Sequence, residues 1–337
     1  MLVPKRVRKG DTVAIVSPSF GAVGQFPHRT ERGIAYLESL GLRVRLMPHA
    51  AETAGWASSS AVSRVTDIHD AFSDDQVTAI VCGIGGNHSS QLLPLLDYDL
   101  IGRHPKIFQG YSDITVLHWA FAKHARLRTF YGPALVTQMA EFPSVLPFTD
   151  RFMRAAWFGE SPLEFEPATE WTDEHLEWAD KTDLTRPRAM QPGSGWVCVR
   201  PGVTRGWLMG GCVETLCWHV KGSDSWLDLD GAVLFLETSE EAPSPAHVDA
   251  YLVDLENLGV FEQINALVIG RPMSYSAEES EQLLAVAADR TAHSGIPVLG
   301  NVDCSHTDPM LTLPLGSTID LDAGQRIFRA LEVATTD

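Results

Sequence analysis

The sequence predicts an α/β protein with two domains: an N-terminal doubly wound parallel sheet and a C-terminal mixed α/β domain, with an active site between them. Strand and helix patterns alternate at first, dissolve in a segment rich in Pro, Trp and acidic residues, and return near residue 200. A chain of 337 residues with 45% hydrophobic content is also long enough for two ordinary domains. We expect an N-terminal domain over 1–145, a Trp-rich linker and substrate loop over 146–200, and a C-terminal domain over 201–337.

The N-terminal elements follow one another in the order of a doubly wound sheet. Apolar runs ended by Gly or Pro predict strands, and apolar residues at helical spacing predict the helices between them. The expected order is a strand at 11–16, a helix at 30–40, a strand at 42–48, a helix with Val62, Val65, Ile68 and Phe72, a strand at 77–82, and a strand ending at Gly110. Ligands of such sheets lie beyond the carboxyl ends of the strands, where SPSFG, GIGGNHSS and GYSD stand here.

The C-terminal pattern is mixed. Strand patterns occur in GWLMGGC, GAVLFLE, ALVIG, PVLGNV and LTLPLGSTIDL, with helical patterns around residues 248–258 and 283–290. Seven of the nine tryptophans lie between Trp157 and Trp226, which argues against disorder in the segment before this domain.

Composition excludes several classes of function. The formal net charge of −17 repels phosphate backbones and anionic membranes, so neither nucleic acid nor a membrane is an expected partner. The basic start of the chain precedes an apolar run too short for a secretory signal or a membrane span. Five cysteines without a CxxC pair indicate neither a disulfide framework nor a zinc site, and a cytoplasmic location is expected.

The stretch KIFQGYSDITVLHWAFAKH places Ser112 where a strand turns into a helix. Ile107 and Phe108 favour a strand, and from Ile114 the apolar positions recur at helical spacing. A serine at this corner either caps the helix or presents its hydroxyl for chemistry. This stretch alone leaves both interpretations open.

A serine nucleophile needs a base and a group that orients the base. His306, in the turn CSHTDPM between two strand patterns, and His88, after the glycine loop, are candidate bases, whereas His118 points away from the corner. Glu237 ends the apolar strand LFLE and is the candidate acid, although an acid there can equally be solvated at the sheet rim. Asp113 lies on the first helical turn, where an acid stabilises the helix without any catalytic role.

The glycine loop GIGGNH permits close approach of backbone N–H groups. Gly85 and Gly86 can offer such groups to an oxyanion. The loop lacks the third glycine of a dinucleotide fingerprint and the lysine of a phosphate loop, so a nucleotide cofactor is not indicated.

Taken together, these stretches resemble the LD-carboxypeptidase-like serine peptidases, within them the branch of the microcin C immunity peptidases. The resemblance covers nearly the whole chain through GDTVAIVSPS, GIGGNHSSQLLPLLDYDLI, HPKIFQGYSDITVLH, TFYGPAL, GWLMGGCVETL, VLFLETSEE, LGVFEQINALVIGR and HTDPMLTLPLG. It implies a flavodoxin-like or amidotransferase-like N-terminal domain and a Ser-His-Glu triad of Ser112, His306 and Glu237. It also implies an oxyanion hole from the backbone N–H groups of Gly85 and Asp113, with no metal and no cofactor, in a homodimer.

The resemblance leaves the substrate open. Immunity peptidases cleave an amide between an acidic aminoacyl group and a nucleotide-like part, whereas murein-recycling members remove a terminal D-alanine from tetrapeptides. Substrate contacts are expected from Gly86, Glu214, Glu241 and Trp196, the last by stacking on a nucleobase, with Trp171 and Trp178 as alternatives. The other interpretation of these tryptophans is that they only pack the lid on the body of the protein. Glu241 and Glu214 stand where immunity members are expected to have lysine and asparagine, which makes microcin C itself a doubtful substrate.

Two other classes of protein share some of these features. A non-catalytic protein that binds a small peptide or nucleotide would have the same cleft but would not depend on Ser112. An ordinary α/β-hydrolase shares the order serine, acid, histidine, but its nucleophile elbow needs glycine two residues after the serine, where this chain has Ile114.

Overall fold

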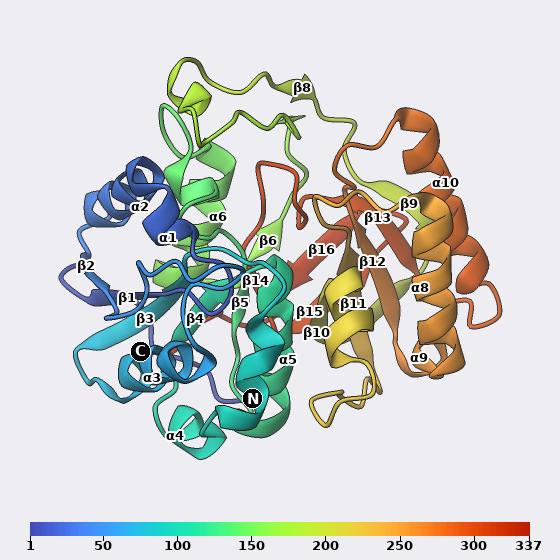
Figure 1. Ribbon diagram of the computed structural model, residues 1–337. Helices are drawn as coiled ribbons and strands as arrows, with labels where there is room; N and C mark the ends of the chain where they lie inside the picture. The colour runs from blue at the N-terminus through green and yellow to red at the C-terminus, as the bar shows by residue number, and fades with distance from the viewer.

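The computed structural model describes residues 1–337 and has two α/β domains, each built on its own sheet. In Figure 1 the N-terminal domain runs from blue to green, and the C-terminal domain from yellow to red. The predicted fold class is confirmed. No helix is long and apolar enough to cross a membrane.

The first sheet has the strand order β14-β5-β4-β3-β1-β2. All its pairings are parallel except that of β14 with β5. The strands are β1 (Thr12–Val16), β2 (Arg43–Leu46), β3 (Val77–Cys82), β4 (Ile107–Gly110), β5 (Phe130–Tyr131) and β14 (Leu313–Pro314). The helices of this domain are α1 (Ala22–Gln25), α2 (Pro27–Ser39), α3 (Ala61–Ser73), α4 (Tyr98–Arg103), α5 (Thr115–Ala120) and α6 (Pro147–Phe158).

The central strands are mostly apolar and almost entirely buried because the sheet is covered on both faces. Each residue of β1 and β4 is buried. β2, at the sheet edge, is mostly exposed and alternates arginine with apolar residues. Strands β1, β2 and β3 and helix α2 thus lie where the sequence patterns predict them.

The second sheet has eight strands in the order β6-β16-β15-β10-β11-β12-β13-β9. Its centre, β10 to β13, is parallel, and its outer pairings are antiparallel. The strands are β6 (Glu164–Phe165), β9 (Val197–Arg200), β10 (Val203–Cys212), β11 (Ala232–Glu237), β12 (Ala266–Gly270), β13 (Val298–Val302), β15 (Thr318–Asp322) and β16 (Ile327–Ala330). The helices are α7 (Val213–Thr215), α8 (Pro245–Asn257), α9 (Val260–Gln263) and α10 (Ala277–Arg290).

Residues 146–200, expected as a linker and substrate loop, contribute to both domains. Helix α6 packs on the first domain, where the Trp157 indole N–H donates to Gln109 Oε1. Strands β6 and β9 belong to the second sheet. Between them, β7 (Glu170–Trp171) and β8 (Gln191–Pro192) form a small hairpin. In Figure 1 this segment runs over the top from α6 to β9. The domain boundaries predicted from the sequence stay a prediction.

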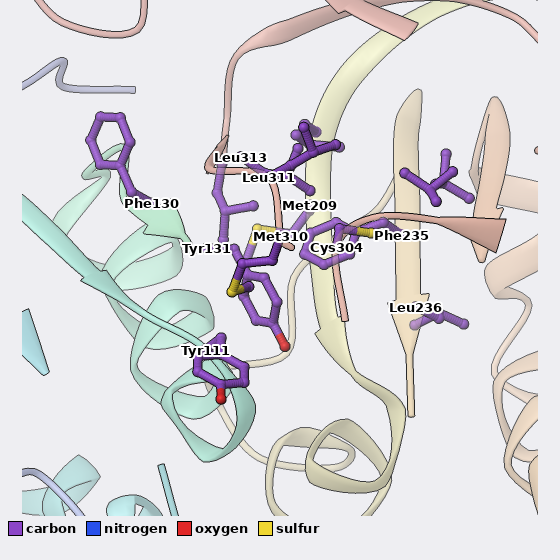
Figure 2. Close-up of a cluster of buried hydrophobic side chains, with 14 of the residues drawn as sticks. Tyr111, Phe130, Tyr131, Met209, Phe235, Leu236, Cys304, Met310, Leu311 and Leu313 are labelled. Carbon is purple, nitrogen blue, oxygen red and sulfur yellow. The ribbon is translucent and has the colours of Figure 1, made fainter. Parts of the chain in front are cut away.

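The two domains share a large hydrophobic core, and the first domain has a second, smaller one of its own. A cluster of 67 buried residues includes side chains from both sheets. Figure 2 shows part of it, where Tyr131 of β5 lies near Phe235 of β11, with ring centroids 5.0 Å apart. A Cβ on Gly211 would lie 2.4 Å from Thr115 Oγ1 at the start of α5, so glycine permits this close approach. The domains are therefore packed together at the carboxyl ends of β4 and β10.

Candidate active site

Ser112 lies at the corner between β4 and α5, in a short 3₁₀ turn over Ser112–Ile114. Its φ of +63° is in the left-handed region, which is uncommon for serine and costs roughly 1–3 kcal/mol. The side chain caps neither this turn nor α5. Of the two interpretations of the corner, the structure thus favours a hydroxyl presented to its surroundings.

Asp113 fastens the glycine loop to this corner. Its buried carboxylate accepts hydrogen bonds from the backbone N–H groups of His88 at 3.0 Å and Ser89 at 2.9 Å. Ser89 Oγ in turn donates to the carbonyl oxygen of Asp113 at 2.8 Å. The Asp113 side chain therefore has a structural role.

Gly85 lies against Ser112 so closely that only glycine fits. A Cβ added to Gly85 would lie 2.8 Å from Ser112 Cβ, 3.0 Å from its Oγ and 3.2 Å from the Asp113 nitrogen. A Cβ on Gly86, whose φ is +136°, would lie 2.5 Å from Ser19 Oγ. The backbone of the glycine loop and that of Asp113 thus meet beside the serine hydroxyl.

Glu237, the last residue of β11, is buried behind His306. Its Oε2 accepts a hydrogen bond from His306 Nδ1 at 2.8 Å. Its Oε1 accepts one from the Tyr131 hydroxyl at 2.5 Å, and that hydroxyl accepts one from the Ser112 backbone N–H at 3.2 Å. A chain of contacts therefore joins the serine corner, Tyr131, the carboxylate and the imidazole. Tyr131, whose ring is drawn between the domains in Figure 2, was not predicted as a site residue; the motif TFYGPAL was its only signal.

His306 presents its other ring nitrogen to the cavity. Nε2 makes no aligned hydrogen bond, and it lies 3.1 Å from Oε2 of Glu240 in an ion-pair contact. No hydrogen bond joins it to Ser112, although both residues line one cavity. The Tyr111 ring lies against the imidazole, with centroids 4.9 Å apart. The hydrogen bond between a catalytic nucleophile and its base is often long when no substrate is bound.

The charges around His306 favour the imidazolium form. Burial alone lowers the pKa of His306, but the carboxylates of Glu237 and Glu240 outweigh it and raise that pKa well above 6.5. Partial burial opposes ionisation of Glu240, but the close ion-pair contact with the His306 imidazolium outweighs it and lowers the Glu240 pKa to about 2. Burial raises the pKa of Glu237, while His306 and Tyr131 act in the opposite direction.

A cavity of about 390 Å³ opens above these groups, between the domains. Gly85, Gly86, Ser112 and His306 line it. Its outer wall comes from the segment 174–188, which is fastened to both domains. Arg188 of that segment forms ion pairs with Glu141 at 2.5 Å and with Asp308 at 2.7 Å, and Asp183 accepts from Arg29 at 2.8 Å.

The structure brings only some of the predicted substrate contacts to this cavity. Gly86 lines it, whereas Trp196, Glu214 and Glu241 do not. Trp196 is buried in the C-terminal domain, where its indole N–H donates to Asp303 at 2.8 Å and its ring packs on Phe328. This differs from the expectation because the GSGW turn leads directly into β9 and carries its tryptophan into the core. Trp178, one of the alternatives, does line the cavity.

Glu214 and Glu241 are also placed differently from the expectation. Glu214 is buried at the start of the second domain's first helix, and its Oε1 accepts from the Ser239 N–H at 2.9 Å and hydroxyl at 2.6 Å. Glu241 is exposed, and its N–H donates to Ser239 Oγ. Both residues thus shape the turn after β11. The acid of this turn that faces the cavity is Glu240, which was not predicted as a site residue although it stands in the same ETSEE stretch.

No group of three or more His, Cys, Asp and Glu side chains could hold a metal ion.

Fold and site together define a two-domain α/β protein in which a serine at a strand-to-helix corner shares an interdomain cavity with a histidine–glutamate pair. The family models of the LD-carboxypeptidase N-terminal and C-terminal domains match residues 13–132 and 205–321. The chain belongs to this family of peptidases, as its motifs predicted.

Curated relatives align with nearly the whole chain. The putative carboxypeptidase YocD of Bacillus subtilis is 34% identical over 319 residues, 94% of this chain and 95% of its own length. The microcin C7 self-immunity protein MccF of Escherichia coli is 31% identical over 318 residues, 93% of this chain and 91% of its own length. A probable murein peptide carboxypeptidase of B. subtilis is 28% identical over 330 residues, 96% of this chain and 92% of its own length.

Solved structures agree with this assignment. MccF without ligand and MccF in complex with aspartyl sulfamoyl adenosine each have a TM-score of 0.92 and 28% identity, with both chains covered completely. An MccF-like protein from Bacillus anthracis has a TM-score of 0.90 and 29% identity, covering 99% of this chain and 100% of its own.

Proposed function

We propose that this protein is a serine hydrolase that cleaves an amide bond in a small peptide or aminoacyl-nucleotide through an acyl-enzyme. The observation that carries the proposal is the hydrogen-bonded His306–Glu237 pair, which shares a cavity with the strained Ser112. Family membership supports it, because relatives are named as carboxypeptidases and as an immunity protein.

In this mechanism Ser112 attacks the amide carbonyl while His306 Nε2 takes its proton. Glu237 holds the imidazole through Nδ1 and stabilises the imidazolium that forms. The N–H groups of Gly85 and Asp113 stabilise the oxyanion, and one such donor is worth about 2.7–4 kcal/mol in the transition state. His306 then protonates the leaving amine, and water hydrolyses the acyl-enzyme by the same steps.

For the leaving group, we favour a nucleotide-like part. MccF has been solved with aspartyl sulfamoyl adenosine and glutamyl sulfamoyl guanosine, and this supports a comparable substrate here. The alternative is removal of terminal D-alanine from murein tetrapeptides, as the name of one relative suggests. A protein that only binds such ligands is the alternative of another class. Cytoplasmic location and homodimeric assembly remain predictions.

The test is to incubate the protein separately with a murein tetrapeptide and with aspartyl- and glutamyl-sulfamoyl adenosine, and to follow amine release. We expect cleavage of at least one sulfamoyl adenosine. Cleavage of the tetrapeptide alone would contradict the proposed leaving group, and binding without cleavage of any compound would favour the non-catalytic alternative.

Trp178 is the side chain that we propose to stack on the nucleobase. It is half-buried at the cavity, with Phe26 edge-on at 5.3 Å and the Arg29 guanidinium 4.3 Å from its ring centroid. Stacking on an aromatic is worth roughly 1–3 kcal/mol per base. Trp178→Ala should therefore weaken binding of adenosine monophosphate by roughly 5-fold to 150-fold in calorimetry. Trp56→Ala, which removes an exposed tryptophan that does not line the cavity, is the control; equal effects of both changes would contradict the assignment.

The value of kcat/KM should increase with pH, with a midpoint at a pKa above 6.5. His306 must be neutral to accept a proton, and its raised pKa leaves it protonated at lower pH. The groups that contact it are Glu237, Glu240 and Tyr111. Asp308, two residues further along the same loop, is in an ion pair with Arg188. A profile of the free enzyme that is already flat at pH 6 would contradict this assignment of the base.

A further inference from the structure

Glu240 touches the reacting nitrogen of His306, yet the proposed mechanism gives it no role. It stands three residues after Glu237 in the turn that follows β11, and its side chain is 62% exposed. The turn is held from below, since buried Glu214 accepts two hydrogen bonds from Ser239. The carboxylate of Glu240 is thus presented to the cavity from a fixed backbone.

Among the acids that line the cavity, Glu240 is the one without an arginine or lysine partner. The others are paired: Glu141 and Asp308 with Arg188, Glu174 with Arg186, and Asp183 with Arg29 and Arg32. The two arginines that line the cavity, Arg29 and Arg188, are both already in ion pairs with these acids. An incoming anion therefore finds no unpaired arginine or lysine in the cavity, whereas an incoming cation finds Glu240, whose ion-pair contact is with His306.

The contact with Glu240 also competes with catalysis. His306 is only 9% exposed, and its Nε2 has no aligned hydrogen bond and lies 3.1 Å from Glu240 Oε2 instead of bonding to Ser112. A carboxylate at this place stabilises the imidazolium and so reduces the fraction of free base. For His306 to act as the base, a group other than its imidazole must bind the Glu240 carboxylate.

We propose that Glu240 is a specificity residue that binds an ammonium group on the acyl side of the scissile amide, and that this binding releases His306 Nε2 for Ser112. The ligand class is an amide whose acyl part carries a primary ammonium near the carbonyl, either the α-ammonium of an aminoacyl group or the side-chain ammonium of a diamino acid. The inference rests on the proposed hydrolase function and adds to it the charge that the acyl group must carry.

The proposal is tested with aspartyl-sulfamoyl adenosine and its N-acetyl derivative, in which an uncharged amide replaces the ammonium group. The wild-type protein should hydrolyse the free ammonium compound with a kcat/KM at least about 10-fold higher, because the acetylated compound has no ammonium group to draw Glu240 away from His306 Nε2. Glu240→Gln should lose most of this preference, and Glu240→Asp should recover part of it. Glu281→Gln, which removes an exposed carboxylate on α10 outside the cavity, should behave like the wild type. A Glu240→Gln variant that keeps the preference, or that changes both substrates equally, overturns the proposal.

A binding measurement separates this inference from the proposed hydrolase function. In the Ser112→Ala background, calorimetry should show tighter binding of the ammonium compound than of the acetylated one, and the further change Glu240→Gln should remove that difference. If the wild type hydrolyses neither compound but the binding difference depends on Glu240, the hydrolase function fails and the ammonium site stands. If the Ser112→Ala protein binds both compounds equally, or binds neither, the inference is overturned.

Discussion

Replacing Ser112 with alanine should lower kcat on a sulfamoyl adenosine substrate by roughly 10⁴–10⁶-fold, because the residual rate then comes from binding and the oxyanion donors alone. The change removes only an oxygen atom. Because the serine hydroxyl caps no helix and the φ of +63° disfavours serine and alanine alike, the free energy of unfolding should change little. Steady-state kinetics and thermal unfolding of the purified variant measure both quantities.

Ligand affinity is the control for this variant. Ser112→Ala should bind aspartyl-sulfamoyl adenosine about as tightly as the wild type, since the Gly85 and Asp113 backbone groups remain in place. A variant that retains more than about a tenth of the wild-type rate would show that the hydroxyl is not the nucleophile.

The second large effect is expected from Glu237→Gln. A glutamine at the end of β11 can still fill the volume, but it cannot stabilise the imidazolium, and its amide N–H₂ can face the imidazole or the Tyr131 hydroxyl. By analogy with other triads, kcat should fall about 10⁴-fold with little change in KM. Because one carboxylate that raises the pKa of His306 is lost, that pKa should also fall, and a histidine-resolved NMR titration measures this.

Glu262→Gln serves as a matched control for that titration. Glu262 is an exposed carboxylate that pairs with His293 on the surface and does not line the cavity. Its replacement should leave the pKa of His306 and the rate unchanged. A normal rate for Glu237→Gln would mean that the buried acid is structural and that another group orients the base.

The sequence predicted the fold class and the family because their signals are local. The strand at Val77–Cys82 is a mostly apolar run, and the glycine after it marks the turn. The corner at Ser112 could be located for the same reason, since β-branched and aromatic residues give way there to helical spacing. His306 and Glu237 were located from strand ends and family motifs, and the structure places them in contact.

The rest of the site depends on contacts between distant segments, which periodicity does not encode. Trp196 and Trp178 lie in the same Trp-rich segment, and only the path of the chain carries one into the core and the other to the cavity. Tyr131 gains its role from meeting Glu237 across 106 positions of sequence. Glu240 and Glu241 are adjacent and chemically identical, so only the conformation of the turn after β11 determines which of them faces the cavity.

The pairing of β14 with β5 means that neither half of this chain is a self-sufficient module. Leu313 and Pro314 form β14, the edge strand of the first sheet next to β5. The Leu315 N–H also donates to the Thr129 carbonyl at 2.8 Å. A fragment truncated before β10 would expose an unpaired edge of β5 together with Tyr131, a template for aggregation. Swapping or separately expressing the halves of this protein would therefore require that residues 313–315 travel with the N-terminal half.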